Sequence, residues 1–184
     1  TEPETIYVLV EQGALLKSVN DGESWVELSS YSQADEVAYR DTHRLLINDN
    51  DPDRFYLATG EGLYRSGNGG QEWDHLTRRG DRMGYPDFLF FDPSDDRTVF
   101  MGGSYKNPGA WFADGIADSS VMRSDDAGDN WTDLRDGLPS PMVGAIEAMT
   151  MHCWTGGKML VIGTATGELY ASEDSGGSWV CIAD

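Results

Sequence analysis

The 184-residue sequence predicts an all-β fold assembled from four repeated antiparallel sheets. Four tryptophans recur at spacings of 48, 58 and 48 residues, each at the end of a similar eight-residue segment. Two short apolar stretches with strand character precede each segment, and turn-forming Gly, Asn and Asp residues separate them. A repeat near 48 residues matches one four-stranded antiparallel sheet per unit, which is the size of a β-propeller blade.

The repeated segments share the pattern Ser-x-Asp/Asn-x-Gly-x-x-Trp. An Asp or Asn side chain accepts hydrogen bonds from backbone N–H groups just ahead of it, and Gly tolerates positive φ, so the pattern predicts a tight turn. We expect the Trp to start the next strand and to pack into the sheet core. These residues are therefore assigned a structural role: Ser18, Asn20, Gly22, Trp25, Ser66, Asn68, Gly70, Trp73, Ser124, Asp126, Gly128, Trp131, Ser172, Asp174, Gly176 and Trp179.

The segments resemble the Asp-box, or BNR repeat, of sialidases and many other β-propellers. The resemblance covers nearly the whole chain and implies membership of the sialidase-like, glycosyl hydrolase BNR-repeat superfamily. The sequence departs from the usual pattern at Asn20 and Asn68, which stand in place of Asp, and at Glu72 and Asn130, where Ser or Thr is usual. Asn can accept the same hydrogen bonds, so these departures are mild.

The strands can be placed unit by unit. The second and third strands of the four units are expected at residues 6–10 and 15–18, 55–59 and 63–66, 99–103 and 121–124, and 159–163 and 169–172. Inner strands are expected at 45–48, 88–91 and 144–152, and each is followed by a turn rich in Asp, Asn or Gly. The first unit has no inner strand in this sequence.

These assignments predict one propeller domain with blades at about 1–30, 43–77, 86–135 and 142–184, and an insertion at 105–120. Four blades form a partial or half propeller with open sheet edges, and such edges need cover. The sequence therefore predicts a homodimer through the open blade edges or a fragment of a longer propeller.

Composition excludes several classes of protein. The chain carries 13 Lys and Arg against 32 Asp and Glu, a net charge of −19, which argues against nucleic-acid binding. A hydrophobic content of 39% argues against disorder, and the longest apolar runs are too short to span a membrane. Cys153 and Cys181 are expected to be buried free thiols. No signal peptide is visible at the first residues, which favours a cytoplasmic location.

Four long segments are expected on one face of the propeller: residues 29–44, 77–87, 105–120 and 135–142. They hold seven of the 13 basic residues and are close to neutral, whereas the rest of the chain carries nearly all the negative charge. This face could bind a carbohydrate, an anionic small ligand or a protein partner. The basic residues are Arg40, Arg44, Arg78, Arg79, Arg82, Lys106 and Arg135.

The candidate ligand-binding residues are Arg44, Arg78, Arg79, Arg82, Trp111 and Phe112. Guanidinium groups could bind a carboxylate, as the sialidase resemblance suggests, or could pair with nearby Asp residues. Trp111 and Phe112 could stack on a sugar or peptide, or could fill the central channel. Asp114 and Asp118 are candidate catalytic acids, because glycoside hydrolysis needs two positioned carboxyl groups, although solvated loop charges are the alternative.

The function predicted first is an Asp-box propeller module that binds a ligand or partner without catalysis. The alternative is a sialidase-like or xyloglucanase-like glycoside hydrolase. Sialidases typically carry an Arg-Ile-Pro motif that this sequence lacks. No nucleotide-binding loop, nucleophile elbow or zinc motif occurs, so the sequence predicts no cofactor and no metal. The turns at 48–53 and 92–96 lack the pattern of a calcium loop.

Overall fold

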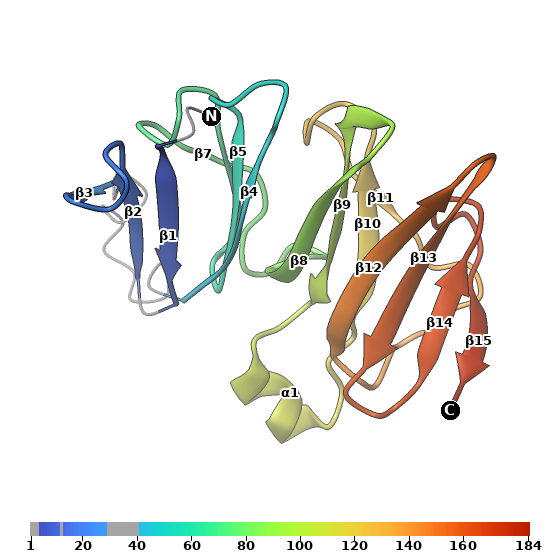
Figure 1. Cartoon of the computed structure of the whole chain (residues 1–184). Coiled ribbons are helices and arrows are strands. Elements are labelled where there is room, and N and C mark those ends of the chain that lie inside the picture. Colours follow the sequence, from blue (N-terminus) through green and yellow to red (C-terminus); the bar gives the residue numbers. More distant parts are fainter. Residues whose placement is uncertain (1–3, 12, 29–40) are drawn as a thin grey trace.

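The computed structural model describes residues 4–11, 13–28 and 41–184. Within these residues the chain forms four antiparallel sheets that stand side by side like the blades of a fan, in the order of the sequence (Figure 1). The all-β, blade-type fold expected from the sequence is confirmed.

Each sheet is a meander in which consecutive strands pair. The described part of the first sheet has three strands and each of the others has four. The strands are β1 (Ile6–Val10), β2 (Ala14–Ser18) and β3 (Val26–Glu27); β4 (Thr42–Ile47), β5 (Phe55–Thr59), β6 (Gly62–Ser66) and β7 (Asp74–His75); β8 (Tyr85–Asp92), β9 (Asp95–Ser104), β10 (Ser120–Ser124) and β11 (Thr132–Asp133); and β12 (Ile146–Trp154), β13 (Gly157–Thr164), β14 (Leu169–Ser172) and β15 (Val180–Ala183).

Three hydrophobic cores lie between successive sheets. Leu15 and Leu57 meet between the first and second sheets, and Tyr56 joins Met101 between the second and third. Phe100, Ile162 and other residues fill the space between the third and fourth. Each inner sheet therefore buries both of its faces, which explains why β5 is buried along its whole length.

The four Ser-x-Asp/Asn-x-Gly turns have one hydrogen-bond pattern. The Ser hydroxyl accepts the N–H of the Gly at 2.8–2.9 Å and donates to the Asn or Asp side chain at 2.8–3.0 Å. The Asn or Asp Oδ1 accepts the N–H four residues ahead of it. The Gly of the repeated pattern, at positions 22, 70, 128 and 176, has φ between +85° and +93°, a conformation that L side chains adopt rarely.

The carboxylates of these turns are held in their charged form. Hydrogen bonds from the Asn130 side chain and backbone lower the pKa of Asp126 to about 2. The backbone and hydroxyl of Ser178 lower the pKa of Asp174 to about 2 in the same way. The stabilisation from these bonds is present above the ordinary Asp pKa and is lost as the pH falls towards 2.

The tryptophans of the turns do not all enter a core. Trp179 is 3% exposed, and Trp73 and Trp131 pack at the edges of cores, but Trp25 is 41% exposed. Each buried Trp packs toward the preceding sheet. Trp25 belongs to the first sheet, which has no preceding sheet in the described part of the chain.

One further expectation needs correction. Cys153 and Cys181 are exposed, not buried. Cys153 lies near the end of β12 and Cys181 on the edge strand β15, so neither is covered by another sheet. The insertion at 105–120 contains a short helix, α1 (Pro108–Asp114), which begins after the N-cap Asn107 and ends at Gly115 with φ of 72°.

Candidate functional site

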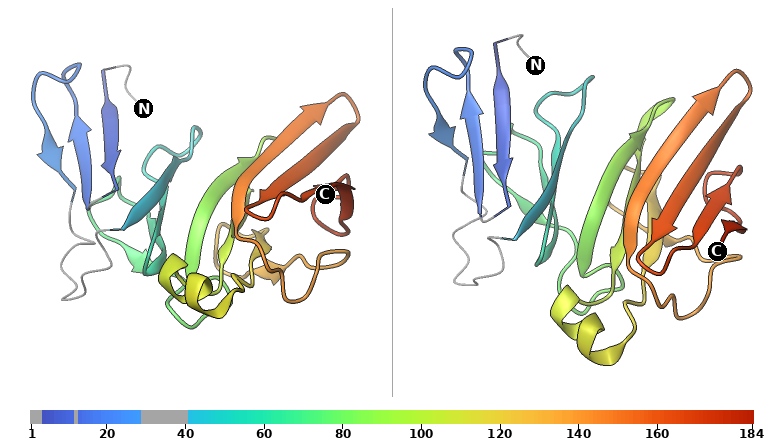
Figure 2. Two further views of the ribbon diagram at one scale, coloured as in Figure 1. Left: turned by 90° about the horizontal axis from the view of Figure 1, so that it is seen from below. Right: turned by 60° about the horizontal axis from the view of Figure 1, so that its bottom comes forward.

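The candidate site lies where the inner strands β4, β8 and β12 begin. These three starting points and α1 lie at the same end of the molecule, opposite the turns that follow the inner strands (Figure 1; Figure 2). Three of the segments that the sequence places on one face, residues 77–87, 105–120 and 135–142, connect strands in the described part of the chain.

Each of the three inner strands has an irregularity near its start, in the pairing with the strand that follows it. The register shifts at His43 in β4, at Asp87 in β8 and at Glu147 in β12. A bulge re-aims a side chain that regular pleating would point elsewhere. The bulge therefore recurs in three successive sheets, and each time it carries a titratable residue.

The three bulge residues line one cleft of about 390 Å³. Trp111 and Phe112 of α1 contribute to the same cleft, with their rings stacked at 5.7 Å between centroids and 29° between planes. Phe112 is 82% exposed, so its ring is available to a ligand. The remaining lining residues are Glu11, Asp41, Tyr85, Phe88, Pro108 and Ile146.

His43 lies between two carboxylates. Its Nε2 is 3.3 Å from Asp41 Oδ1, and its Nδ1 is 3.3 Å from Asp87 Oδ1. Nδ1 is also 2.6 Å from the carbonyl oxygen of Pro86. Tyr85 packs its ring on His43 at 4.6 Å and donates its hydroxyl proton to Asp41 Oδ2 at 2.9 Å. These contacts join the second sheet to the third at the cleft wall.

The environment alters the acidity of two of these groups. Burial raises the pKa of Asp87 to about 6, and the carboxylates of Glu147 and Asp41 add to this rise while His43 opposes it. Burial, followed by the hydrogen bond to Asp41, raises the pKa of Tyr85 well above 10. Asp87 can therefore hold a proton near neutral pH, which an exposed Asp cannot do.

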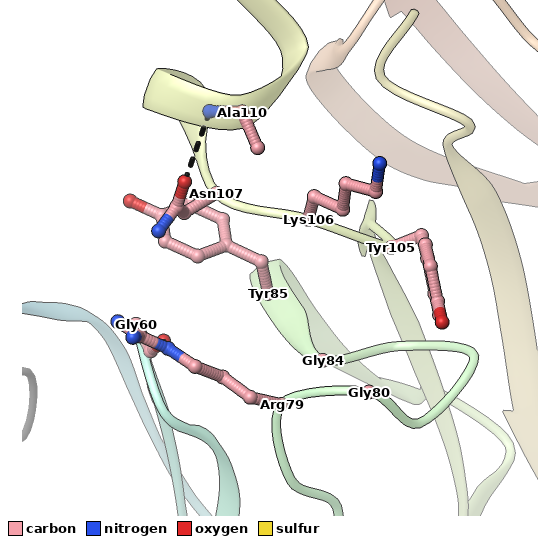
Figure 3. Close-up of a pocket in the computed structure, with 9 residues that line it drawn as sticks. All are labelled: Gly60, Arg79, Gly80, Gly84, Tyr85, Tyr105, Lys106, Asn107 and Ala110. Atoms are coloured by element: carbon pink, nitrogen blue, oxygen red, sulfur yellow. Dashed lines mark hydrogen bonds between the residues drawn. The ribbon is translucent and has the colours of Figure 1, made fainter. Parts of the chain in front are cut away.

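A second pocket of about 270 Å³ lies on the other side of Tyr85, between Arg79 and the start of α1 (Figure 3). Arg79 donates from Nε to Gly60 O at 3.3 Å and pairs through Nη2 with Glu61 at 2.7 Å. Figure 3 shows the Asn107 side chain turned to the N–H of Ala110, and the Lys106 side chain extending away from Arg79. The two cations of this pocket therefore do not converge.

The arginines expected to bind a ligand are dispersed. Arg82 pairs with Asp118 at 3.5 Å and Asp133 at 3.1 Å. Arg78 Nη1 lies 2.8 Å from His75 Nδ1. Arg44 is exposed on β4, and Arg40 lies outside the described residues. Arg79 lines the second pocket, so these side chains form no shared anion site among the described residues.

The carboxylates expected to act in catalysis lie apart from the cleft. Asp114 pairs with Lys106 at 2.6 Å, and Asp118 pairs with Arg135 at 3.0 Å as well as with Arg82. Neither Asp lines the cleft. Ion pairing with nearby Asp residues is the alternative that the sequence left open for the arginines, and Arg82 and Asp118 show it.

Sequence reasoning did not select His43, Asp87 or Glu147 as site residues. A signal exists in the repeat, since Asn48 directly follows β4 and Asp92 ends β8, and His43 and Asp87 lie five residues before them. Aligning the inner strands would have placed two titratable residues at one equivalent position. Their convergence still depends on the bulges, which no short pattern reveals.

Neither a metal cluster nor a membrane helix is found in the described part of the chain. No group of three or more His, Cys, Asp or Glu residues there could hold a metal ion. No helix among the described residues has the length and apolarity to cross a bilayer.

The fold and the cleft define a class of protein, a set of β-propeller blades with a ligand-sized cleft at one end of the inner strands. Solved structures support this fold class. An ancestral GH74 enzyme superposes with a TM-score of 0.73 at 16% identity, over 100% of this chain and 23% of that one. The GH74 enzyme of Niastella koreensis gives 0.63 at 20% identity, over 92% and 26%. YCF48 bound to D1 peptide gives 0.60 at 12% identity, over 98% and 51%.

Two curated relatives are similar in sequence, and both are named xyloglucanase Xgh74A from Acetivibrio thermocellus. They are 26% and 25% identical to this chain over 159 residues. The match covers 77% of this chain, which spans 17% of the length of those relatives. No family model matches. The chain is therefore similar in sequence to a part of these xyloglucanases, and it shares the β-propeller fold of the solved structures.

Proposed function

We propose that this chain is the carbohydrate-binding part of a glycoside-hydrolase-related β-propeller, with the sugar held in the cleft beside α1. The observation that carries the proposal is the convergence of three bulge residues, His43, Asp87 and Glu147, on one cleft with an aromatic wall. Sugar sites combine an apolar or aromatic surface with a few convergent polar groups, and this cleft has both.

The charge of the cleft favours a neutral ligand. Among the described residues, four carboxylates line it, Glu11, Asp41, Asp87 and Glu147, against one potential cation, His43. An anionic ligand would meet repulsion here, whereas hydroxyl groups can donate hydrogen bonds to carboxylates. The xyloglucanase relatives make a xyloglucan oligosaccharide the first ligand to test.

We further propose that the four Ser-x-Asp/Asn-x-Gly-x-x-Trp turns are Asp-boxes. Support comes from their shared hydrogen bonds and from the positive φ of all four glycines. In this proposal the boxes hold the hairpins together at the end of the blades remote from the cleft, and they take no part in binding.

The binding proposal is tested by titrating xyloglucan oligosaccharides into the protein in a calorimeter. We expect Phe112→Ala and Trp111→Ala each to weaken binding by roughly 2- to 10-fold, because a lost aromatic stacking contact costs about 0.5–1.5 kcal/mol. Trp154→Ala is the matched control, since Trp154 is an exposed aromatic at the far end of β12. Equal losses in all three variants, or binding that none of them changes, would reject the cleft as the site.

Hydrolysis is the second candidate function. The observation that favours it is the raised pKa of Asp87, because a general acid must hold a proton at the working pH. Glu147 and Asp41 flank Asp87 in the same cleft. Assaying the same mixtures for new reducing ends separates the two functions, and binding without new ends supports the non-catalytic module.

A further inference from the structure

The contacts of His43 fix where one of its protons lies. The carbonyl oxygen of Pro86 can only accept a hydrogen bond, and it lies 2.6 Å from His43 Nδ1. Nδ1 must therefore carry a proton. Asp87 Oδ1, at 3.3 Å from the same nitrogen, faces this proton as well.

The other ring nitrogen then lacks a partner of the right kind. In a neutral imidazole with its proton on Nδ1, Nε2 is an acceptor. Yet Nε2 is buried and faces Asp41 Oδ1 at 3.3 Å, and that carboxylate is also an acceptor. Two lone pairs that face each other are unfavourable here, because the His43 side chain is only 11% exposed and its Nε2 is buried. One additional proton, on Nε2 of His43 or on Asp41, removes the conflict.

Glu147 adds a negative charge that favours the uptake of this proton. It brings a third carboxylate from β12 to the cleft that holds Asp41 and Asp87, and Glu11 brings a fourth from the turn after β1. The other titratable group among the described residues of the cleft is Tyr85, which already donates to Asp41. The cleft-lining residues of α1 are Pro108, Trp111 and Phe112, and none of these is charged. Nothing else among the described residues that line the cleft can neutralise the excess negative charge.

We propose that the cluster of Asp41, His43 and Asp87 takes up one proton and that this proton controls the affinity of the cleft for its ligand. In the protonated cluster, His43 holds β4 against β8 and fixes the position of the cleft wall. In the unprotonated cluster, the carboxylates repel one another across the cleft wall. Tight binding belongs to the protonated state. The inference rests on the proposed function, since it concerns regulation of the same cleft.

A titration without ligand tests the first half of the proposal. The ¹³C signal of the Asp87 carboxyl group is followed by NMR in the full chain and in His43→Gln. We expect a midpoint near pH 6 in the unmodified chain, and a higher midpoint in His43→Gln because the cation that opposes the rise has been removed. A midpoint near 4 in both proteins, with no proton uptake at His43 or Asp41 between pH 5 and 8 in the same spectra, would overturn the proposal.

A binding series tests the second half. Xyloglucan oligosaccharide is titrated at pH 5.0, 6.0 and 7.5, and uptake of one proton predicts an affinity that falls roughly 10-fold per pH unit above the midpoint. Asp87→Asn and His43→Gln should flatten this dependence because each variant removes one titratable group of the cluster. Asp49→Asn removes an exposed carboxylate from the turn after β4 and should keep it.

The outcomes separate this inference from the function on which it rests. Binding that does not vary with pH, or a slope that survives in Asp87→Asn, overturns the inference and leaves carbohydrate binding intact. Absence of binding at all three pH values rejects the proposed function itself. In that case the NMR titration still shows whether the cluster of Asp41, His43 and Asp87 binds the proton.

Discussion

At the scale of single residues, Ser124 shows how one hydroxyl stabilises a whole turn. It is 1% exposed, accepts the N–H of Gly128 at 2.8 Å and donates to Asp126 at 2.8 Å. Removing the hydroxyl leaves the buried N–H of Gly128 without its partner. An unsatisfied buried group costs more than the bond itself contributes, because it cannot return to water.

Ser124→Ala should therefore lower the free energy of unfolding by about 1–3 kcal/mol. The measurement is equilibrium unfolding in urea, followed by tryptophan fluorescence. Ser178→Ala provides the control, since Ser178 bonds to Asp174 from an exposed position in the fourth turn and should change stability little. A loss in Ser124→Ala no larger than in Ser178→Ala would show that the buried hydroxyl is not important.

Residues differ in how well their structural role can be predicted from the sequence. Gly22 and its three equivalents follow from a pattern of eight residues, because the turn that needs positive φ is local. His43, Asp87 and Glu147 could not be placed in this way. Their meeting requires bulges in three strands and the packing of three sheets, and their sequence neighbours carry neither property.

At the scale of elements, two of the strands that precede a repeated turn, β6 and β10, each reach into the turn of the next sheet. Arg65 on β6 donates to Ala127 O at 2.8 Å, and Arg123 on β10 donates to Ser175 O at 3.1 Å. Ala127 and Ser175 occupy the same position of the repeated turn, directly before its Gly. The same contact therefore fastens the second sheet to the third and the third to the fourth.

Arg65→Lys should weaken the contact between the second and third sheets. Lys keeps the positive charge but lacks the planar fork with which Arg65 reaches both Ala127 O and Asp129 Oδ1. We expect the free energy of unfolding to fall by about 1–2 kcal/mol. Arg97→Lys, at an exposed position in the β8–β9 hairpin, should be neutral. Chemical denaturation of both variants decides, and equal stabilities would contradict a fastening role for Arg65.

The elements also show where sequence reasoning stops. Apolar runs and turn residues indicated the strands of all four sheets, but α1 was expected only as part of an insertion. Its signals are an N-cap Asn107, Pro108 at the first turn and Gly115 at the end. A seven-residue helix among Gly and Pro has too little periodicity to stand out from a loop. Its packing beside the inner strands carries Trp111 and Phe112 to the cleft.

At the scale of the whole molecule, stability comes from the spaces between sheets. The three cores alternate with the four sheets, so no sheet buries its apolar residues alone. The outer sheets remain open on one side, with Val8 and Val10 of β1 and Val180 and Ile182 of β15 exposed. These faces give physical support to the expectation that further blades or a second copy cover them, which stays a prediction.

Net charge acts at this scale too. The chain carries −19, and the described ion pairs are mostly partly exposed, so each contributes little. Repulsion among the excess carboxylates opposes the compact state, and added salt screens it. Raising NaCl from about 20 to 200 mM, across which the screening length falls to roughly 7 Å, should therefore stabilise the protein rather than weaken it. If screening contributes about 1 kcal/mol, the melting temperature should rise by roughly 2–4 °C.

Differential scanning calorimetry in NaCl, KCl and choline chloride checks this prediction. Screening depends on ionic strength, so the three salts should give the same rise. A rise with one cation alone would instead indicate specific binding. A fall in melting temperature with all three would show that the ion pairs, including the charges around His43 and Asp87, outweigh the repulsion of the whole chain.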